Sequence, residues 1–411
     1  MSRFSPLSRL AEPADMFHPR HYIESRDTAA GLKSLPPWAY TSDRFLEREM
    51  QTVFRDNWNV IERTDRIPVA GDYFTMTFLG APLLVTRGQD MKVRVFANVC
   101  RHRSALVAMG EGKAKSFRCA YHSWTYGLDG GLMSAPDYRD LSGNQIINDT
   151  NRKDYGLVEI NSALWGGFIF IRFADEGISL EEQLGDVATK VANHHPEDMV
   201  CTRRKVFEID TNWKLFVENV NETYHIPHIH GQTLDLQKRQ MHPQDEVAGN
   251  YVAILAQHEG SRLVIKGDKE FPRIPTLEGR YGMGTYYCTL YPGTMIAFSP
   301  DGLIYYQIEP LSPSRTRMTV GSCFPKDVPN RPDFDEVVQG YYKRVDLVIP
   351  EDVLVTDTQQ IGLTSAFTRP SRLGHLETMM HAFDQWLMDK VIDEPKKATP
   401  QPAKPAQPVA A

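Results

Sequence analysis

The sequence predicts an α+β protein: an N-terminal all-β domain followed by a C-terminal domain in which helices cover an antiparallel sheet. Between about residues 58 and 172, short alternating apolar runs are cut by Gly, Pro and Asp, a pattern typical of small β domains. Between residues 284 and 323, aromatic strand-like runs are separated by Pro and Gly. Helical patterns follow, which is typical of an antiparallel sheet with helices packed on it.

The sequence predicts further helices and strands in both parts of the chain. Residues 43–57 are amphipathic and predict a helix, and residues 205–210 predict a strand that leads into a histidine-rich segment. Residues 179–193 predict one helix with an acidic first turn. His194 and His195 follow it, and we interpret them as a solvated helix end. Three further helices are expected at residues 332–348, 350–363 and 377–391.

These elements predict four segments. They are an N-terminal arm (1–37) that packs on another subunit or wraps its own domain, the all-β domain (38–175), the helix-covered domain (176–392) and a disordered Pro/Ala-rich tail (393–411).

The overall composition narrows the class of protein. The 411 residues carry a net charge of -6 with acidic and basic residues well mixed, so neither nucleic acid nor a membrane is an expected partner. No apolar run approaches the length of a membrane span, and we expect a cytoplasmic protein. The five cysteines are odd in number and scattered, which argues against a disulfide framework. We interpret Cys201, Cys288 and Cys323 as small buried residues of the hydrophobic core, without a role in chemistry.

Two short Cys/His pairs lie inside the predicted β domain. Cys100 and His102 form one pair, and Cys119 and His122 form the other. Two thiolates and two imidazoles match the ligand set of a Rieske [2Fe-2S] centre, so the all-β domain is expected to be a Rieske domain. The alternative is a structural zinc, although such sites normally open with C-x2-4-C. The nearby Gly127, Gly130 and Gly131 are expected to point amide N–H groups at the cluster sulfurs.

A second metal motif lies in residues 212–230. Glu222 and His225 are three residues apart, on one face of an expected helix, and Pro227 is expected to bend that helix so that His230 turns back toward His225. Two histidines and one carboxylate form the facial site that holds Fe(II). Asp352 is our choice for the third ligand, with Glu351 and Asp357 as competitors.

The two motifs together resemble the Rieske non-heme iron oxygenases, whose members include the α subunits of aromatic-ring-hydroxylating enzymes and the choline, glycine betaine and carnitine monooxygenases. The resemblance covers roughly residues 38–390. It implies that the Cys100 and Cys119 pairs hold the [2Fe-2S] cluster and that His225, His230 and Asp352 hold a mononuclear Fe(II). The family spacing of an acidic residue eight before a glutamine fits Asp352 and Gln360.

The same resemblance implies how electrons move. Glu222 would be a catalytic residue that links His225 to His122 of an adjacent subunit, in a head-to-tail homotrimer. Electrons from NAD(P)H would arrive through a separate reductase or ferredoxin. The sequence contains no G-x-G-x-x-G dinucleotide fingerprint, which agrees with a separate reductase. The resemblance assigns His228 no role as a ligand, and we expect it to line the pocket or bond to backbone.

The substrate is the least determined feature. Many ring dioxygenases of the family that this sequence resembles carry Asp at the position of Glu222, whereas Glu resembles the choline, glycine betaine and carnitine branch. The resemblance therefore favours hydroxylation or oxidative demethylation of a quaternary ammonium or methylated amine, with O2 as co-substrate. Ring hydroxylation of an aromatic acid is the alternative. The candidate cations for an acid are Arg262, Arg273 and Arg280. The candidate wall residues for either substrate are Tyr286, Tyr287, Tyr291, Phe298, Tyr305 and Tyr306. Two non-enzymatic classes also stay open, a Rieske electron carrier and a zinc-stabilised binding protein.

Overall fold

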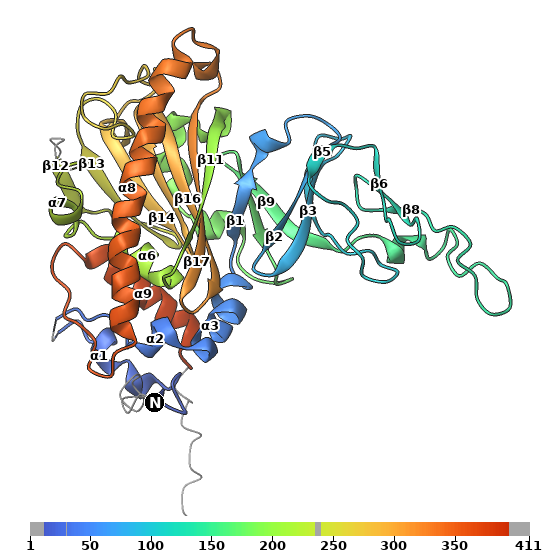
Figure 1. Ribbon diagram of the computed structural model, residues 1–411, viewed down its shortest axis with the longest axis horizontal. Helices are drawn as coiled ribbons and strands as arrows, with labels where there is room; N and C mark the ends of the chain where they lie inside the picture. The colour runs from blue at the N-terminus through green and yellow to red at the C-terminus, as the bar shows by residue number, and fades with distance from the viewer. Residues whose placement is uncertain (1–11, 30, 235–239, 394–411) are drawn as a thin grey trace, which may run out of the picture.

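The computed structural model describes residues 12–29, 31–234 and 240–393. The chain forms a smaller β part that projects from a larger part of helices on a sheet (Figure 1), which confirms the α+β prediction. Most of the expected tail, and residues 1–11 of the expected arm, lie outside the described residues. In the described part, no helix is both long and apolar enough to cross a bilayer.

The smaller part consists of two antiparallel sheets. The seven-stranded sheet has the order β1-β10-β9-β4-β3-β2-β5. Its strands are β1 (Asn59–Arg63), β2 (Asp72–Phe78), β3 (Ala81–Arg87), β4 (Val93–Ala97), β5 (Glu111–Lys113), β9 (Glu159–Trp165) and β10 (Phe168–Arg172). The three-stranded sheet consists of β6 (Ser116–Arg118), β7 (Thr125–Gly127) and β8 (Leu132–Ser134). This small sheet lies toward the end of the molecule remote from α7 (Ile226–Ile229) (Figure 1).

The larger part is built on a second seven-stranded antiparallel sheet, with the order β11-β17-β16-β15-β14-β13-β12. Its strands are β11 (Met199–Ile209), β12 (Gln240–Gln244), β13 (Tyr251–Gln257), β14 (Gly284–Leu290), β15 (Thr294–Ser299), β16 (Gly302–Ser312) and β17 (Arg315–Pro325). Side chains alternate between its two faces. Tyr287 and Tyr306 pack toward the helices, whereas Tyr286 and Tyr305 pack in the core that also holds Trp58 of the smaller part.

Helices cover one face of this sheet. They are α6 (Trp213–Val220), α8 (Phe334–Leu363) and α9 (Thr378–Val391), together with α2 (Trp38–Thr41) and α3 (Asp43–Glu49), which continues as a π-helical turn to Phe54. Phe45 and Phe54 are buried in the same core as Trp213 and Phe383. Residues 39–54 therefore pack with the second domain, although their sequence position suggested the first.

The N-terminal segment also packs on its own chain. Its short helix α1 (Ile23–Arg26) lies beside α9, where Arg26 pairs with Asp389 and the Ser25 carbonyl accepts a hydrogen bond from Gln385. The described part of the arm thus packs on its own chain, and packing on another subunit stays a prediction.

One prediction was wrong at α8. Residues 332–348 and 350–363 were expected as two helices, but Phe334–Leu363 is a single helix with Pro350 inside it. An interior proline removes a backbone hydrogen bond and costs about 3 kcal/mol. Buried residues nevertheless continue at helical spacing on both sides of it, with Val345 and Val348 before the proline and Asp352, Thr356 and Gln360 after it. We infer that packing on the sheet offsets the local cost.

A second prediction was wrong at residues 179–193. The structure has two short helices, α4 (Leu180–Leu184) and α5 (Val187–Lys190), which are separated at Gly185. Gly185 has φ of +55°, and a Cβ there would lie 1.3 Å from the carbonyl oxygen of Ala248. Close approach of the segment around Ala248 therefore breaks the helix. His194 was interpreted as solvated, but it is 1% exposed and its ring packs 5.5 Å from that of Phe298.

Candidate metal centres and active site

The two Cys/His loops of the first domain have the same local geometry. In each loop, the amide of the fourth residue after the cysteine donates to the cysteine carbonyl at 3.0 Å, from Ser104 to Cys100 and from Ser123 to Cys119. Both serines have positive φ, 56° and 61°. This turn folds each loop back on itself. The rings of His102 and His122 consequently lie side by side, with centroids 4.5 Å apart.

The spacing of the four donors fits a two-iron cluster better than a single zinc. A tetrahedral zinc would bring its donor atoms within roughly 3.3–3.8 Å of one another. Among the described residues, no three of these four side chains have donor atoms within 4.8 Å of one another. Cys100 and Cys119 are buried, His102 is half-buried and His122 is exposed. Two buried thiolates below two more accessible imidazoles fit a Rieske cluster.

The surroundings of these loops differ from one expectation. The amides of Gly127, Gly130 and Gly131 do not point at sulfur: they donate to Gly131 O, Gly127 O and Asp129 Oδ1. Gly130 is required instead because a Cβ there would lie 2.4 Å from the Phe96 ring.

The polar contact to sulfur comes from Tyr126, which the sequence analysis missed. Its hydroxyl lies 3.3 Å from Cys100 Sγ and accepts the Arg101 N–H at 3.0 Å. Trp124 stacks on His102, with ring centroids 5.0 Å apart and planes 7° apart. Position 126 lies two residues after Trp124, on the same face of strand β7, and this period-2 placement is a signal that could have identified it.

The second motif is shaped by a loop and a short helix. Asn212 caps the start of α6 by accepting from the Lys214 N–H at 3.1 Å. The α6 helix ends before Glu222, so Glu222 and His225 lie in a loop and not on one helix as predicted. Pro227 does not bend a helix, because it lies in the first turn of α7, where proline is favoured. His225 precedes α7 and His230 follows it.

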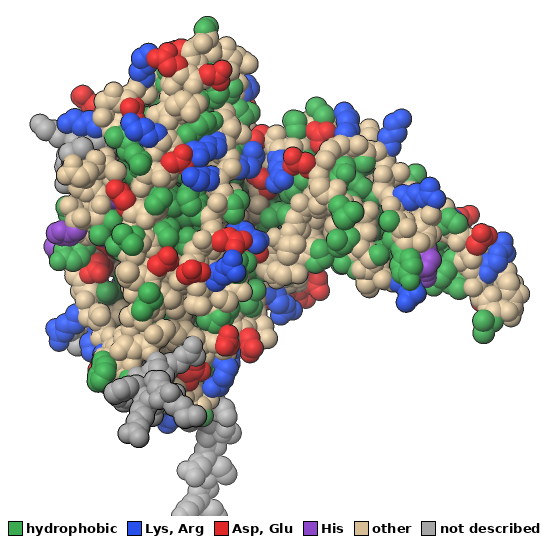
Figure 2. Space-filling model, viewed as in Figure 1, with side chains coloured by type: hydrophobic (Ala, Val, Ile, Leu, Met, Phe, Trp, Pro, Cys, Tyr) green, Lys and Arg blue, Asp and Glu red, His purple; other side chains and the backbone are tan. Residues whose placement is uncertain are grey.

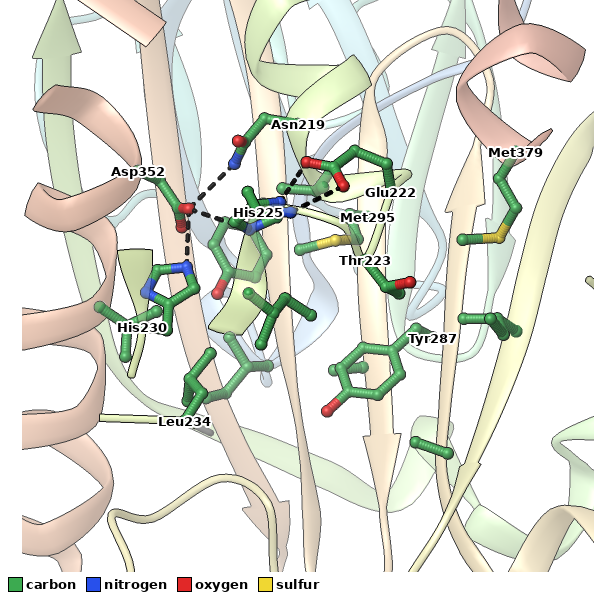
Figure 3. Close-up of a pocket in the computed structure, with 18 of the residues that line it drawn as sticks. Asn219, Glu222, Thr223, His225, His230, Leu234, Tyr287, Met295, Asp352 and Met379 are labelled. Carbon is green, nitrogen blue, oxygen red and sulfur yellow. Dashed lines mark hydrogen bonds and ion pairs between the residues drawn. The ribbon is translucent and has the colours of Figure 1, made fainter. Parts of the chain in front are cut away.

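This loop and helix bring His225 and His230 together with Asp352 of α8. One donor atom from each lies within 4.8 Å of the others. Asp352 Oδ1 is 2.9 Å from His230 Nε2 and 3.6 Å from His225 Nε2, and Asn219 donates to the same oxygen at 2.9 Å. Figure 3 shows Asp352 between the two imidazoles. The group has the composition of a 2-His-1-carboxylate iron site.

Each imidazole also has its own carboxylate on the opposite nitrogen. Glu222 pairs with Nδ1 of His225, and Glu351 lies 2.7 Å from Nδ1 of His230. A carboxylate at Nδ1 holds the proton there and leaves Nε2 as the metal donor. Burial disfavours a charged His230, yet Asp352 and Glu351 raise its pKa above the usual value. The same negative field favours a bound cation.

The competitors of Asp352 therefore have other positions. Glu351 lies against Nδ1 of His230 and also accepts a hydrogen bond from Thr233 Oγ1 at 2.7 Å. Asp357 is outside the triad, and burial and Asp210 raise its pKa. His228 is exposed and does not line the cavity, contrary to one expectation, and its ring contacts Tyr224.

The triad opens on a cavity of about 100 Å³. Of the six expected wall aromatics, Tyr287 and Tyr306 line it, while the other four point elsewhere. Arg262, Arg273 and Arg280 are not lining residues. Arg344 of α8 lines the cavity instead, and the sequence analysis did not single it out. Most of the remaining wall is apolar, and it includes Leu234, Met241, Ile254, Met295, Ile304, Val348 and Met379.

Comparison with known proteins agrees with this arrangement. Residues 57–145 match the model of the Rieske [2Fe-2S] domain, and residues 196–393 match that of the ring hydroxylating alpha subunit (catalytic domain). The chain belongs to the Rieske non-heme iron oxygenases. Enzymes of this family contain a Rieske cluster and a mononuclear non-heme iron, use O2 and take electrons from a partner reductase or ferredoxin. The chain is accordingly an oxygenase, which excludes the electron-carrier and binding-protein readings.

Choline and glycine betaine monooxygenases are similar to this chain in sequence. The glycine betaine monooxygenase oxygenase subunit of Pseudomonas aeruginosa (strain UCBPP-PA14) is 34% identical over 213 residues, 52% of this chain and 47% of the relative. Chloroplastic choline monooxygenase of Atriplex hortensis is 29% identical over 358 residues, 85% of this chain and 76% of the relative.

Two solved Rieske oxygenases share the fold. The quaternary ammonium Rieske monooxygenase CntA in complex with L-carnitine superposes with a TM-score of 0.74 at 22% identity, covering 89% of this chain and 97% of that one. Naphthalene 1,2-dioxygenase from Rhodococcus sp. bound to indole has the same TM-score at 18% identity, covering 93% and 99%. Because the scores are equal, the fold alone does not separate amine oxidation from ring oxidation.

Proposed function

We propose that this protein is the terminal oxygenase of a monooxygenase system that hydroxylates, and thereby demethylates, a small quaternary ammonium compound. The observation that carries the proposal is the His225, His230 and Asp352 triad opening on a small cavity walled by apolar side chains and tyrosine. Ring faces and methionine sulfur suit an N-methylated cation. The choline and glycine betaine monooxygenases among its relatives support the same substrate class.

The residues that would hold each cofactor follow from the geometry. Cys100, His102, Cys119 and His122 would hold the [2Fe-2S] cluster. His225 Nε2, His230 Nε2 and Asp352 would hold the mononuclear Fe(II), which supplies O2 activation when bound. Glu222 and Glu351 keep the Nδ1 protons in place. The apolar wall excludes bulk water and positions the methyl group.

The overall reaction balances with electrons from outside the chain. One N-methyl C–H bond is replaced by C–O, one oxygen atom of O2 enters the product, and the other leaves as water with two electrons and two protons. The resulting carbinolamine breaks its C–N bond to give formaldehyde and the amine with one methyl fewer. We propose NAD(P)H as the electron source, through a separate reductase or ferredoxin.

Electron transfer between neighbouring subunits, in a head-to-tail homotrimer, is the second part of the proposal. Within one chain the Cys/His loops and α7 lie toward opposite ends of the molecule (Figure 1), and histidine side chains are visible at both ends of the surface (Figure 2). Glu222 lines both the catalytic cavity and an adjoining polar cleft of about 420 Å³. We propose that this cleft receives the exposed His122 of a neighbour, so that Glu222 bridges it to His225.

None of the five cysteines, all of which lie in the described residues, forms a disulfide. This agrees with a reducing compartment, and we propose the cytoplasm.

Two experiments test these proposals. The first supplies a reductase and NADH and measures formaldehyde release with glycine betaine, L-carnitine, choline and benzoate. Stoichiometric formaldehyde from a methylated amine is expected, whereas ring hydroxylation of benzoate without formaldehyde would overturn the assignment.

The second experiment mixes two inactive variants, Cys100→Ser and Asp352→Ala, by co-expression. Mixed oligomers regain activity if electrons cross between protomers, because each active pair combines an intact cluster with an intact iron site. Absence of complementation in verified mixed oligomers would overturn the inter-subunit path. Sedimentation analysis of the wild-type protein tests the trimer directly.

A further inference from the structure

Arg344 is the unusual charge in the catalytic cavity. It lies on α8, it is 6% exposed, and it lines the same cavity as His225, His230 and Asp352. Among the described residues, its Nε is buried without a hydrogen-bond partner. Its guanidinium interacts with the hydroxyl of Tyr306 on β16, which is also within the electrostatic reach of Asp352. A buried guanidinium normally has a carboxylate partner.

Other charges around α8 do have such partners. Asp346, two residues along α8, pairs with Arg203 at 2.7 Å and with Lys205 at 2.6 Å. The two cavity carboxylates, Asp352 and Glu222, face the iron-site histidines. Within the described part of the chain no carboxylate is left to neutralise Arg344. With Fe(II) bound, Asp352, Glu222 and Glu351 would lie around the metal and its histidines, and Arg344 would still have no carboxylate partner of its own.

We propose that Arg344 is a specificity-determining residue that binds a carboxylate of the substrate. This proposal rests on the proposed function and narrows its substrate class to zwitterions that carry both an N-methylated ammonium group and a carboxylate. The planar guanidinium donates two parallel hydrogen bonds to a carboxylate, which gives orientation as well as charge neutralisation. The ammonium end would then face the His225, His230 and Asp352 triad, in the cavity that Tyr287, Met295 and Met379 also line (Figure 3).

The inference separates two related compounds. Glycine betaine and choline share the trimethylammonium group, but one ends in a carboxylate and the other in a hydroxyl. Choline would leave Arg344 unpaired and add a further positive charge to the cavity. We therefore expect the iron-loaded protein to bind glycine betaine or L-carnitine at least tenfold more tightly than choline, as measured by isothermal titration calorimetry.

Variants of Arg344 test the assignment directly. Arg344→Met keeps much of the volume and removes the charge, so carboxylate substrates are expected to bind at least 50-fold more weakly while choline binding is unchanged or improved. Arg344→Lys keeps the positive charge but lacks the paired N–H donors of a guanidinium. Its affinity for carboxylate substrates is therefore expected to lie between those of the wild-type protein and Arg344→Met. Arg203→Met is the matched control, because it removes an arginine of β11 that pairs with Asp346 of α8 and does not line the cavity. Cluster absorbance and iron content verify that each variant is folded.

The outcomes distinguish this inference from the proposed function. If the wild-type protein releases formaldehyde from choline as well as from glycine betaine, and Arg344→Met changes neither, the carboxylate assignment is overturned while the demethylase stands. If no methylated amine yields formaldehyde but benzoate binds in an Arg344-dependent way, the demethylase is overturned and carboxylate binding by Arg344 is supported.

Discussion

His230 and Glu351 lie 2.7 Å apart, from imidazole Nδ1 to carboxylate Oε2. The next residue of the same helix, Asp352, lies 2.9 Å from the other nitrogen of that ring. Two consecutive residues of α8 thus contact opposite edges of one imidazole. Under the proposed function, Glu351 would orient the ring and Asp352 would share its metal, so these adjacent acidic residues would have different roles.

The first prediction concerns Glu351. Glu351→Gln is expected to lower iron affinity roughly 10- to 100-fold, because His230 loses the charged acceptor that orients it. Iron content after equilibration with graded chelators measures the effect, and the absorbance of the Rieske cluster should be unchanged. Glu336→Gln, in the exposed first turn of the same helix, is the control. Equal iron retention in all three proteins would contradict the role of Glu351.

The second prediction concerns Glu222. In Glu222→Gln the amide oxygen can still accept from His225 Nδ1, so iron should be retained, whereas the negative charge between the two metal centres is lost. Oxidation of the pre-reduced cluster in a single turnover with substrate and O2 is expected to slow roughly 10- to 100-fold. Stopped-flow absorbance measures it. Near-normal product formation in this variant would count against the bridge.

The third prediction concerns the buried His194. Burial lowers its pKa to about 4 from 6.5, so the neutral ring stabilises the fold above pH 6.5, and this contribution is lost as the pH falls from 6.5 toward 4. At pH 5 the loss is about 2 kcal/mol. His194→Leu should reduce the difference in urea stability between pH 7 and pH 5 by about that amount.

His195→Asn is the control for this measurement, because His195 is partly exposed and asparagine tolerates its positive φ. Its acid sensitivity should match the wild-type protein. A His194→Leu protein with unchanged acid sensitivity would show that the ring does not titrate in this range.

The fourth prediction concerns Gly185. Gly185→Ala places a methyl group against the backbone carbonyl of Ala248, so we expect destabilisation of about 3 kcal/mol or more. Gly143→Ala is the matched control: Gly143 also has positive φ, but nothing lies within 4 Å of a Cβ there, and its cost should be only about 1–2 kcal/mol. Thermal melts compare the two. Equal losses would mean that the α4–α5 segment moves away from Ala248.

The sequence alone predicted the chemistry of both proposed metal sites. The proposed cluster ligands Cys100, His102, Cys119 and His122, and the proposed iron ligands His225 and His230, could be singled out because metal ligation depends on residue type and short spacing. Strand and turn composition likewise predicted the all-β domain and the antiparallel sheet of the second domain, because pleat alternation and the conformations of Gly and Pro are local properties.

Only the tertiary structure decided which groups meet across the chain. It separated Asp352 from Glu351 at His230, it brought Arg344 into the cavity in place of Arg262, Arg273 and Arg280, and it buried His194. It also kept α8 continuous through Pro350 and broke the helix at Gly185. These outcomes depend on contacts between segments that are distant in sequence, because packing energies of several kcal/mol override local preferences of about 1–3 kcal/mol.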